Sequence, residues 1–232
     1  MRRLALAALG AVALAGCGSA TSGPGRATVW VTRDRGAVVL HVAKIPAGLT
    51  AMQGLERVAK VGTRYGGRYV RSIDGVDEHG RRTWFYYVNG YLADRGAAEY
   101  RLRAGDVEWW DFRRWRDPAQ DPVVVGAFPE PFLHGYDGKR RRAAVLYDRR
   151  RLRRGAGALA KLLHAGFVGS VRSVPPKDAN LLLLTAEGPV RFGQEGQAKP
   201  PNPGGPVFFV FTGNPLRLAR HPRMFRFRYS VP

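Results

Sequence analysis

The sequence contains a single cysteine, Cys17, so the 232-residue chain can form no internal disulfide and must rely on its own core. Its five histidines are dispersed, and none lies at metal-ligand spacing from another histidine or from the cysteine, which argues against a zinc site. The sequence also lacks a Gly-x-Ser-x-Gly elbow and a phosphate-binding glycine loop, so the visible parts of a nucleophilic enzyme are missing. We therefore predict no catalytic residues, no metal site and no enzymatic activity.

Acidic residues are scarce: 18 Asp and Glu stand against 38 Lys and Arg, which gives a formal net charge of +20 at pH 7. The basic residues form only two dense runs, Lys139–Arg142 and Arg149–Arg154. One interpretation is an anionic partner such as lipid or an envelope polymer, because clustered cations attract polyanions. The other is a solvated surface, because a GC-rich genome encodes an excess of arginine over lysine together with much Ala, Gly and Pro. Neither interpretation predicts a specific nucleic-acid partner.

The apolar run at the N-terminus, Leu4–Ala13, is too short to span a membrane comfortably. Arg2 and Arg3 precede it, and the small residues of Leu14-Ala15-Gly16 lead from it to Cys17. This arrangement resembles the lipobox of bacterial lipoproteins. The resemblance implies that the cysteine is joined to diacylglycerol and becomes the new N-terminus.

A plain signal peptide or an N-terminal membrane helix is the alternative interpretation of this leader. We favour the lipobox because the only cysteine of the chain lies where that chemistry needs it. The sequence therefore predicts a signal peptide and lipobox over 1–17 and a flexible tether over 18–26. The protein is expected outside the cytoplasm, anchored to the bacterial cell membrane through the lipid on Cys17.

Hydrophobic periodicity predicts an α+β fold that begins with a β-grasp-like domain over 27–115. The turn-like stretch Arg33–Gly36 separates two strand-like runs, which indicates a hairpin. An apolar stripe over 50–61, with Thr50 available as N-cap, predicts a helix packed on the sheet. The predicted strands are 27–32, 37–42, 69–73, 84–88 and 107–113.

Four blocks of this domain carry a family resemblance: 52–55, 69–76, 84–90 and 100–110. In this order they resemble the transcobalamin-like C-terminal domain, known in bacteria as DUF4430. The resemblance implies a β-grasp domain of the soluble-ligand-binding group, which in the animal cobalamin carriers closes over one side of the corrin. Those carriers hold cobalamin against a large helical barrel, and no long helical repeat precedes Ala27. We therefore expect no resident cofactor, with cobalamin as an alternative ligand.

Large aromatic side chains are concentrated on the predicted strands 84–88 and 107–113. Successive side chains of a strand point to opposite faces, and the predicted helix covers only one face of the sheet. The other face must be covered by the second half of the chain, be covered by a ligand, or form an exposed binding surface. The candidate ligand-binding residues are Tyr87, Asn89, Trp110 and Trp115, which are taken from these strands and their ends.

The second half of the chain begins after a polar, proline-marked linker over 116–122. Strands that alternate with helical segments predict a small α/β domain over 123–232, which shows no family resemblance. The predicted elements are strands 123–128, 143–147, 181–185, 207–211 and 224–231, a helix 156–164 and a surface loop 193–206.

These observations predict an exported, membrane-anchored protein whose β-grasp domain is a non-enzymatic module that binds an unknown small molecule or envelope protein. An alternative is an envelope interaction protein whose basic second domain contacts anionic lipid or wall polymer. An enzyme acting in the cleft between the domains is the third hypothesis.

Overall fold

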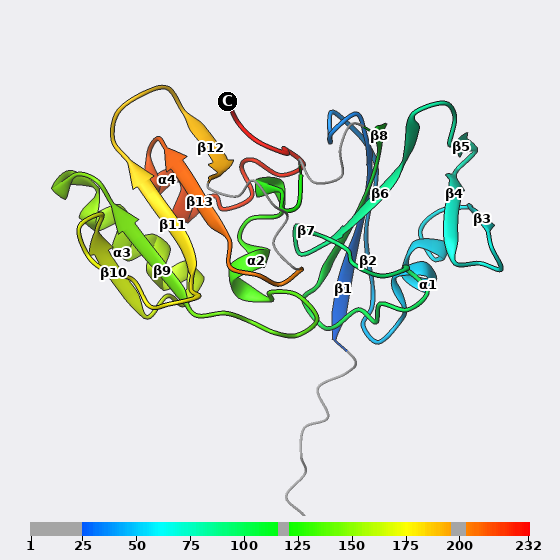
Figure 1. The fold of residues 1–232 in the computed structure, drawn as a ribbon, viewed down its shortest axis with the longest axis horizontal. Helices are drawn as coiled ribbons and strands as arrows, with labels where there is room; N and C mark the ends of the chain where they lie inside the picture. Colours follow the sequence, from blue (N-terminus) through cyan, green and yellow to red (C-terminus); the bar gives the residue numbers. More distant parts are fainter. Residues whose placement is uncertain (1–24, 116–120, 196–202) are drawn as a thin grey trace, which may run out of the picture.

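The computed structural model describes residues 25–115, 121–195 and 203–232. Two five-stranded sheets stand next to each other, the first from the N-terminal half of the chain and the second from the C-terminal half (Figure 1). This mixture of sheets and helices confirms the predicted α+β fold class. Within the described residues, no helix has the length and apolar character needed to cross a membrane. The predicted lipobox with Cys17 lies outside the described residues.

The first sheet has the β-grasp strand order β2-β1-β8-β6-β7. Its strands are β1 (Arg26–Arg33), β2 (Val38–Pro46), β6 (Arg82–Val88), β7 (Tyr91–Leu92) and β8 (Val107–Arg114). β1 and β8 run parallel in the middle, and the other neighbours run antiparallel. Residues 107–113 of β8 are all buried, because both faces of the sheet are covered.

The helix α1 (Ala51–Glu56) covers one face of this sheet and buries Met52 and Leu55. It begins at Thr50 with a capping box, in which Thr50 and Gln53 exchange side-chain to backbone hydrogen bonds. The helix is shorter than the predicted 50–61, because Val61 starts β3 and pairs with Ile73. β3 (Val61–Arg64), β4 (Tyr69–Ile73) and β5 (Val76–Asp77) form a small separate sheet.

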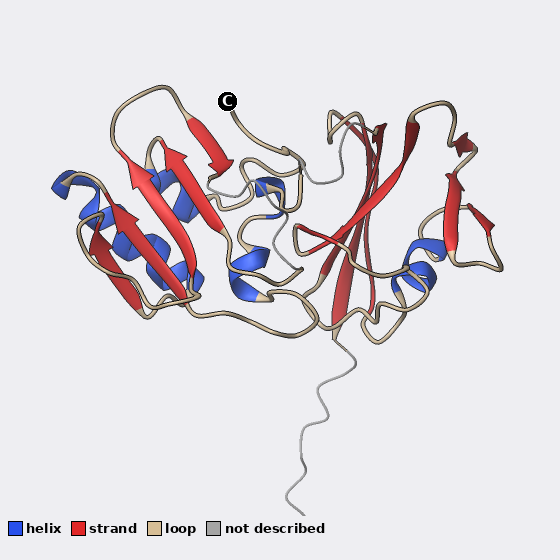
Figure 2. Ribbon diagram, viewed as in Figure 1, coloured by secondary structure: helices blue, strands red, loops and turns tan. Residues whose placement is uncertain are grey.

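The second sheet has the order β10-β9-β11-β13-β12, and only β12 runs antiparallel to its neighbour. Its strands are β9 (Ala143–Tyr147), β10 (Phe167–Ser170), β11 (Asn180–Thr185), β12 (Arg191–Gln194) and β13 (Phe208–Thr212). α3 (Arg153–Leu163) links β9 to β10, and α4 (Pro215–Arg220) follows β13. The two helices pack together on one side of the sheet (Figure 2).

Two predicted strands of the second half are wrong. Residues 123–128 make one bridge, from Val123 to Tyr91, and then turn through the 3-10 helix η2 (Val125–Ala127). Residues 224–231 form turns, with one bridge from Val231 to Phe192. The prediction also omitted β10, and it placed a surface loop where β12 ends.

The C-terminal segment, residues 225–231, returns from the second half of the chain, and its Phe227 and Tyr229 cover the face of the first sheet opposite α1. Tyr229 is buried there, with its ring 5.3 Å from that of Trp109 and 5.7 Å from that of Tyr87. Phe227 contacts Trp30 edge to face at 5.0 Å. The chain itself therefore covers this aromatic face of the first sheet. A ligand, which was one of the predicted alternatives, is not needed to cover it.

Candidate functional site

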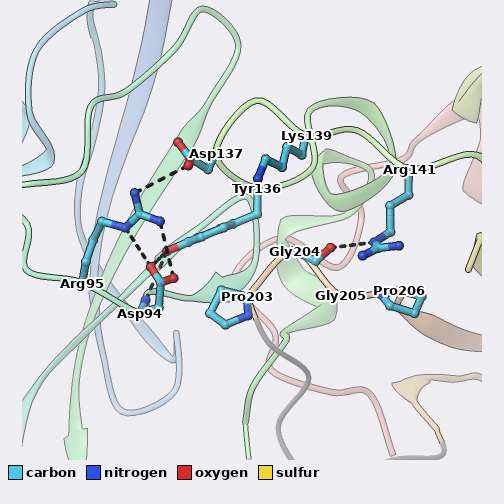
Figure 3. Close-up of a pocket in the computed structure, with 10 residues that line it drawn as sticks. All are labelled: Asp94, Arg95, Tyr136, Asp137, Lys139, Arg141, Pro203, Gly204, Gly205 and Pro206. Atoms are coloured by element: carbon cyan, nitrogen blue, oxygen red, sulfur yellow. Dashed lines mark hydrogen bonds and ion pairs between the residues drawn. The ribbon is translucent and has the colours of Figure 1, made fainter.

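A cavity of about 680 Å³ lies where the end of β7 meets the segment after α2 (Glu130–Leu133) and the approach to β13 (Figure 3). Its volume falls in the range of sites that hold small molecules, roughly 300–1,000 Å³. The residues that line it come from both halves of the chain: Asp94, Arg95, Tyr136, Asp137, Lys139, Arg141, Pro203, Gly204, Gly205 and Pro206.

Asp94 and Tyr136 form the centre of one wall. The Tyr136 hydroxyl donates to Asp94 Oδ1 at 2.6 Å and accepts from the Asp94 backbone N–H at 3.1 Å. Arg95 Nε donates to Asp94 Oδ1 at 3.0 Å. Burial opposes ionisation of Asp94, but the hydrogen bonds from Arg95 and Tyr136 outweigh it and lower the pKa of Asp94. This wall therefore presents an ionised carboxylate with its hydrogen-bond donors already in place.

The pKa of the Tyr136 hydroxyl is raised, first by burial and then by its hydrogen bond to Asp94. The phenol therefore stays protonated at neutral pH. It lies on the same face of the cavity as Arg95, whose guanidinium points toward Asp94 and Asp137 in Figure 3.

Asp137 lies at a tight turn between Tyr136 and Lys139, in which Asp137 and Gly138 both have positive φ angles of 50° and 70°. Its carboxylate binds Arg103 Nη1 at 2.8 Å and lies 3.5 Å from Arg95 Nη1. The hydrogen bond from Arg103 is the main reason that the pKa of Asp137 is lowered. Both carboxylates of the cavity are thus ionised and partnered by arginine.

Lys139 and Arg141 differ from Arg95, which forms salt bridges with both carboxylates of the cavity. Arg141 Nε donates to the Gly204 backbone oxygen at 2.6 Å, and its Nη1 donates to that of Asp178 at 3.3 Å. In the part of the chain that the structure describes, neither Lys139 nor Arg141 forms a salt bridge with a carboxylate. The cavity therefore has an excess of positive charge beside neutral hydrogen-bonding groups.

The four residues predicted from the sequence do not gather at this cavity. Tyr87 pairs with Trp109, and Tyr86 pairs with Trp110, so Tyr87 and Trp110 lie on opposite faces of the sheet. Tyr87 and Trp110 therefore cannot contact one ligand on the same face of the sheet. Burial raises the pKa of Tyr87 to about 12, and its hydroxyl accepts a hydrogen bond from Arg113 Nη2 at 3.0 Å.

Trp110 and Asn89 are both buried by the protein itself. Trp110 stacks on Tyr86 with ring centroids 4.8 Å apart, on the face that α1 covers. Asn89 lies in the turn between β6 and β7 and has a positive φ of 50°. Its side-chain amide donates to Asp106 Oδ1 at 2.7 Å and to the Gly135 oxygen at 2.9 Å. Asn89 therefore holds Gly135 in position, next to Tyr136 in the wall of the cavity.

Trp115 is the accessible member of the four, with 46% of its surface exposed. It borders a smaller cavity of about 370 Å³ beside Arg64, Tyr69 and Glu78. The ligand-binding role of the four residues stays a prediction, and Trp115 is the one that a ligand reaches without displacing the chain.

Sequence reasoning missed Asp94, Arg95, Tyr136 and Asp137. They lie on loops more than 40 positions apart, and no local pattern joins them. The one available signal was the basic run Lys139–Arg142, which the structure places at the rim of this cavity and of a second one beside His164. Among the described residues, no group of three or more His, Cys, Asp or Glu is arranged to hold a metal ion.

Residues 48–114 match the family model of a domain of unknown function, DUF4430. The match confirms the predicted resemblance over the region from α1 to β8. Asp94 and Arg95 lie inside the matched region, and the other residues of the cavity lie outside it.

Among solved structures, the chain is similar to haptocorrin in complex with Cbi, at 16% sequence identity and a TM-score of 0.33. The similarity covers 40% of this chain and 26% of the haptocorrin chain, so this chain spans about a quarter of that protein. No curated protein matches the chain.

Proposed function

We propose that this chain, with its DUF4430 region at residues 48–114, is an exported ligand-binding protein that uses the cavity between Asp94 and Arg141. The observation that carries the proposal is the pair Lys139 and Arg141, two cations that line the cavity and form no salt bridge with a described carboxylate. Such a pair attracts an anionic group, and the ionised Asp94 beside it accepts from hydroxyl or amine groups. The ligand is accordingly a small polar molecule with at least one anionic group and several hydroxyls.

Titration calorimetry on the full-length chain with Cys17→Ser tests this, with citrate as an anionic probe and glucose as a neutral polyol. We expect saturable binding of citrate and weaker binding of glucose. Lys139→Gln should weaken citrate binding by about five-fold, the size of one partly exposed ionic contact of roughly 1 kcal/mol. Lys161→Gln, the same change at an exposed position of α3 outside the cavity, is the matched control. Equal effects of the two substitutions would exclude a specific site.

Cobalamin is tested in the same assay. Its visible absorbance reports binding directly, and quenching of the tryptophans reports contact with the β-grasp half. Saturation at low cobalamin would assign the ligand to the corrin class. Absence of a response would exclude cobalamin as the ligand and leave smaller anions as the ligand class.

The location proposed for the protein rests on the N-terminal pattern that ends in Cys17. Fractionation of cells that produce the chain tests it: the protein should sediment with membranes, and Cys17→Ser should release it. Retention of the Cys17→Ser variant in the membrane fraction would contradict lipidation at this cysteine.

A second candidate function is contact of the basic second half with anionic lipid or wall polymer. It is favoured by the exposed arginines of η3 (Arg150–Leu152) and of the start of α3, which lie on both sides of the buried Leu152 in the sequence. Phosphatidylglycerol vesicles should bind the Cys17→Ser chain at low salt and lose it as salt rises, whereas phosphatidylcholine vesicles should not bind. Binding that salt does not change would contradict this function.

A further inference from the structure

A second cavity, of about 860 Å³, lies on the second half of the chain between α2 and the ends of α3 and α4. It shares no lining residue with the cavity around Tyr136. The residues that line it are Pro129, Glu130, Leu133, His134, Leu162, Arg217, His221, Pro222, Arg223 and Met224. Half of them are apolar and the other half carry ionisable groups, so the cavity is amphipathic.

The apolar wall consists of side chains that the core does not fully use. Leu133 and Leu162 are half-buried, and Met224 is 36% exposed. Pro129 and Pro222 complete the wall with rigid rings. An apolar group that enters the cavity removes this surface from water, which is favourable by about 25 cal/mol per Å² of apolar area.

The charged side of the cavity is organised by Glu130, whose side chain is only 3% exposed. Its Oε1 accepts from Arg223 Nη2 at 2.9 Å, and its Oε2 lies 2.8 Å from His134 Nδ1. The hydrogen bond to Glu130 is the main reason that the pKa of His134 is raised. The buried carboxylate is thus committed to two partners that belong to the protein.

Arg217 has no such partner. It lies on α4, its side chain is exposed, and within the described residues its guanidinium forms no salt bridge. Arg217 and Arg223 together exceed the single negative charge of Glu130, so the cavity carries net positive charge before His134 and His221 are counted. An arginine without a carboxylate at the edge of an apolar cavity is suited to a carboxylate that arrives with an apolar body.

We propose that this cavity binds an amphipathic organic anion, a carboxylate with an alkyl or aryl body. The apolar body lies against Leu133, Leu162 and Met224, and the carboxylate meets Arg217. The site is independent of the cavity around Tyr136 and of the function proposed for it.

Titration of the full-length Cys17→Ser chain with octanoate, and with octanol as the uncharged analogue, tests this site. Octanoate should bind saturably at one site, and octanol should bind at least five-fold more weakly, which is the scale of one charge-assisted contact. Arg217→Gln should weaken octanoate binding by about five- to ten-fold, while Arg220→Gln on the same helix should leave it unchanged. Arg220→Gln is the matched control because it is the same substitution on the same helix, at a residue that does not line the cavity.

Met224→Glu offers a second variant at an exposed position, where the substitution brings a negative charge to the apolar wall without removing a core side chain. It should abolish octanoate binding and leave the thermal unfolding midpoint unchanged. The proposal is overturned if octanoate does not saturate, if octanol binds as well as octanoate, or if Arg220→Gln weakens binding as much as Arg217→Gln. Lys139→Gln should leave octanoate binding intact, which separates this test from that of the other cavity.

Discussion

Glu108 and Asp111 are both buried on strand β8, but their carboxylates lie on opposite faces of the first sheet in different surroundings. Asp111 accepts hydrogen bonds from the Thr32 and Tyr229 hydroxyls and from the backbone N–H groups of Arg35 and Gly36, at 2.6–3.1 Å. Glu108 accepts one, from Trp110 Nε1 at 2.5 Å, and its Oε2 has no partner among the described residues. One acid therefore organises a polar network, and the other is isolated under α1.

This difference shows two ways in which a sheet accommodates a buried acid. Burial raises the pKa of both carboxyl groups, but for Asp111 the hydrogen bonds from Thr32, Gly36 and Tyr229 oppose the effect, and for Glu108 only Trp110 does. Burial therefore favours the neutral form of Glu108. The Asp111 network joins the first hairpin, β8 and the C-terminal segment, so it connects parts of the chain that are far apart in sequence.

The largest expected effect is that of Asp111→Ala. The substitution removes the carboxylate that accepts from the Thr32 and Tyr229 hydroxyls and from the part-buried backbone N–H of Gly36. We expect a loss of about 3–5 kcal/mol in the free energy of unfolding, measured by urea denaturation. Asp111→Asn, which keeps one acceptor oxygen, should lose less. A loss below 1 kcal/mol for the alanine variant would show that the network contributes little.

Tyr229→Phe is expected to have an intermediate effect. It keeps the ring against Trp109 and removes only the hydroxyl that donates to Asp111 Oδ2 at 3.1 Å. We expect a loss of about 1 kcal/mol in the free energy of unfolding, as is usual for one hydrogen bond. Tyr229→Ala, which also removes the ring, should cost about 3 kcal/mol or more. Equal losses for the two variants would place the whole contribution of Tyr229 in its hydroxyl.

Glu108→Gln is expected to have the smallest effect on stability at pH 5. It should have the clearest effect on the way stability depends on pH. The pKa of Glu108 in the folded protein is raised well above the ordinary value of 4.5, so the folded state holds the proton more tightly than the unfolded state. The stabilisation from this proton is complete below pH 4.5 and is lost as pH rises through the folded pKa.

At pH 5 the free energy of unfolding of the variant should therefore lie within about 1 kcal/mol of that of the original chain. As pH rises, the variant should become the more stable of the two, as measured by urea denaturation from pH 5 to 9. Glu56→Gln, at an exposed position of α1, is the matched control and should leave the pH profile unchanged. A Glu108→Gln profile parallel to that of the original chain would contradict a neutral Glu108.

Local sequence signals predicted the first sheet well, because alternation and turn residues are local properties. The Arg33–Gly36 turn, the Thr50 cap and the strands 84–88 and 107–113 all correspond to elements of the structure. The segment 224–231 misled the prediction because Phe225, Phe227 and Tyr229 alternate as in a strand. Their rings instead fill the space against other side chains, without partners in a sheet. Alternation of apolar and polar residues indicates which side chains are buried. It does not indicate whether the backbone forms hydrogen bonds to a neighbouring strand.

The cavity around Tyr136 could not be predicted in this way. Its residues are polar residues, glycines and prolines, which lie on loops and come from positions as distant as Asp94 and Gly204. Each one alone fits a solvated surface, and only the arrangement of the two sheets brings them together. Of the functional signals in the sequence, the basic run Lys139–Arg142 is the one that the structure places at this cavity.

The position of Tyr229 has a consequence for the order of events during synthesis. Domains usually fold in the order in which they leave the ribosome, N-terminal first. Here Trp109 and Tyr87 of the first sheet are covered by Phe227 and Tyr229, which are made well after the strands of that sheet. The first sheet therefore keeps an aromatic face open until residues 227–229 have been made, and a chain that stops short of Tyr229 leaves that face exposed to other molecules.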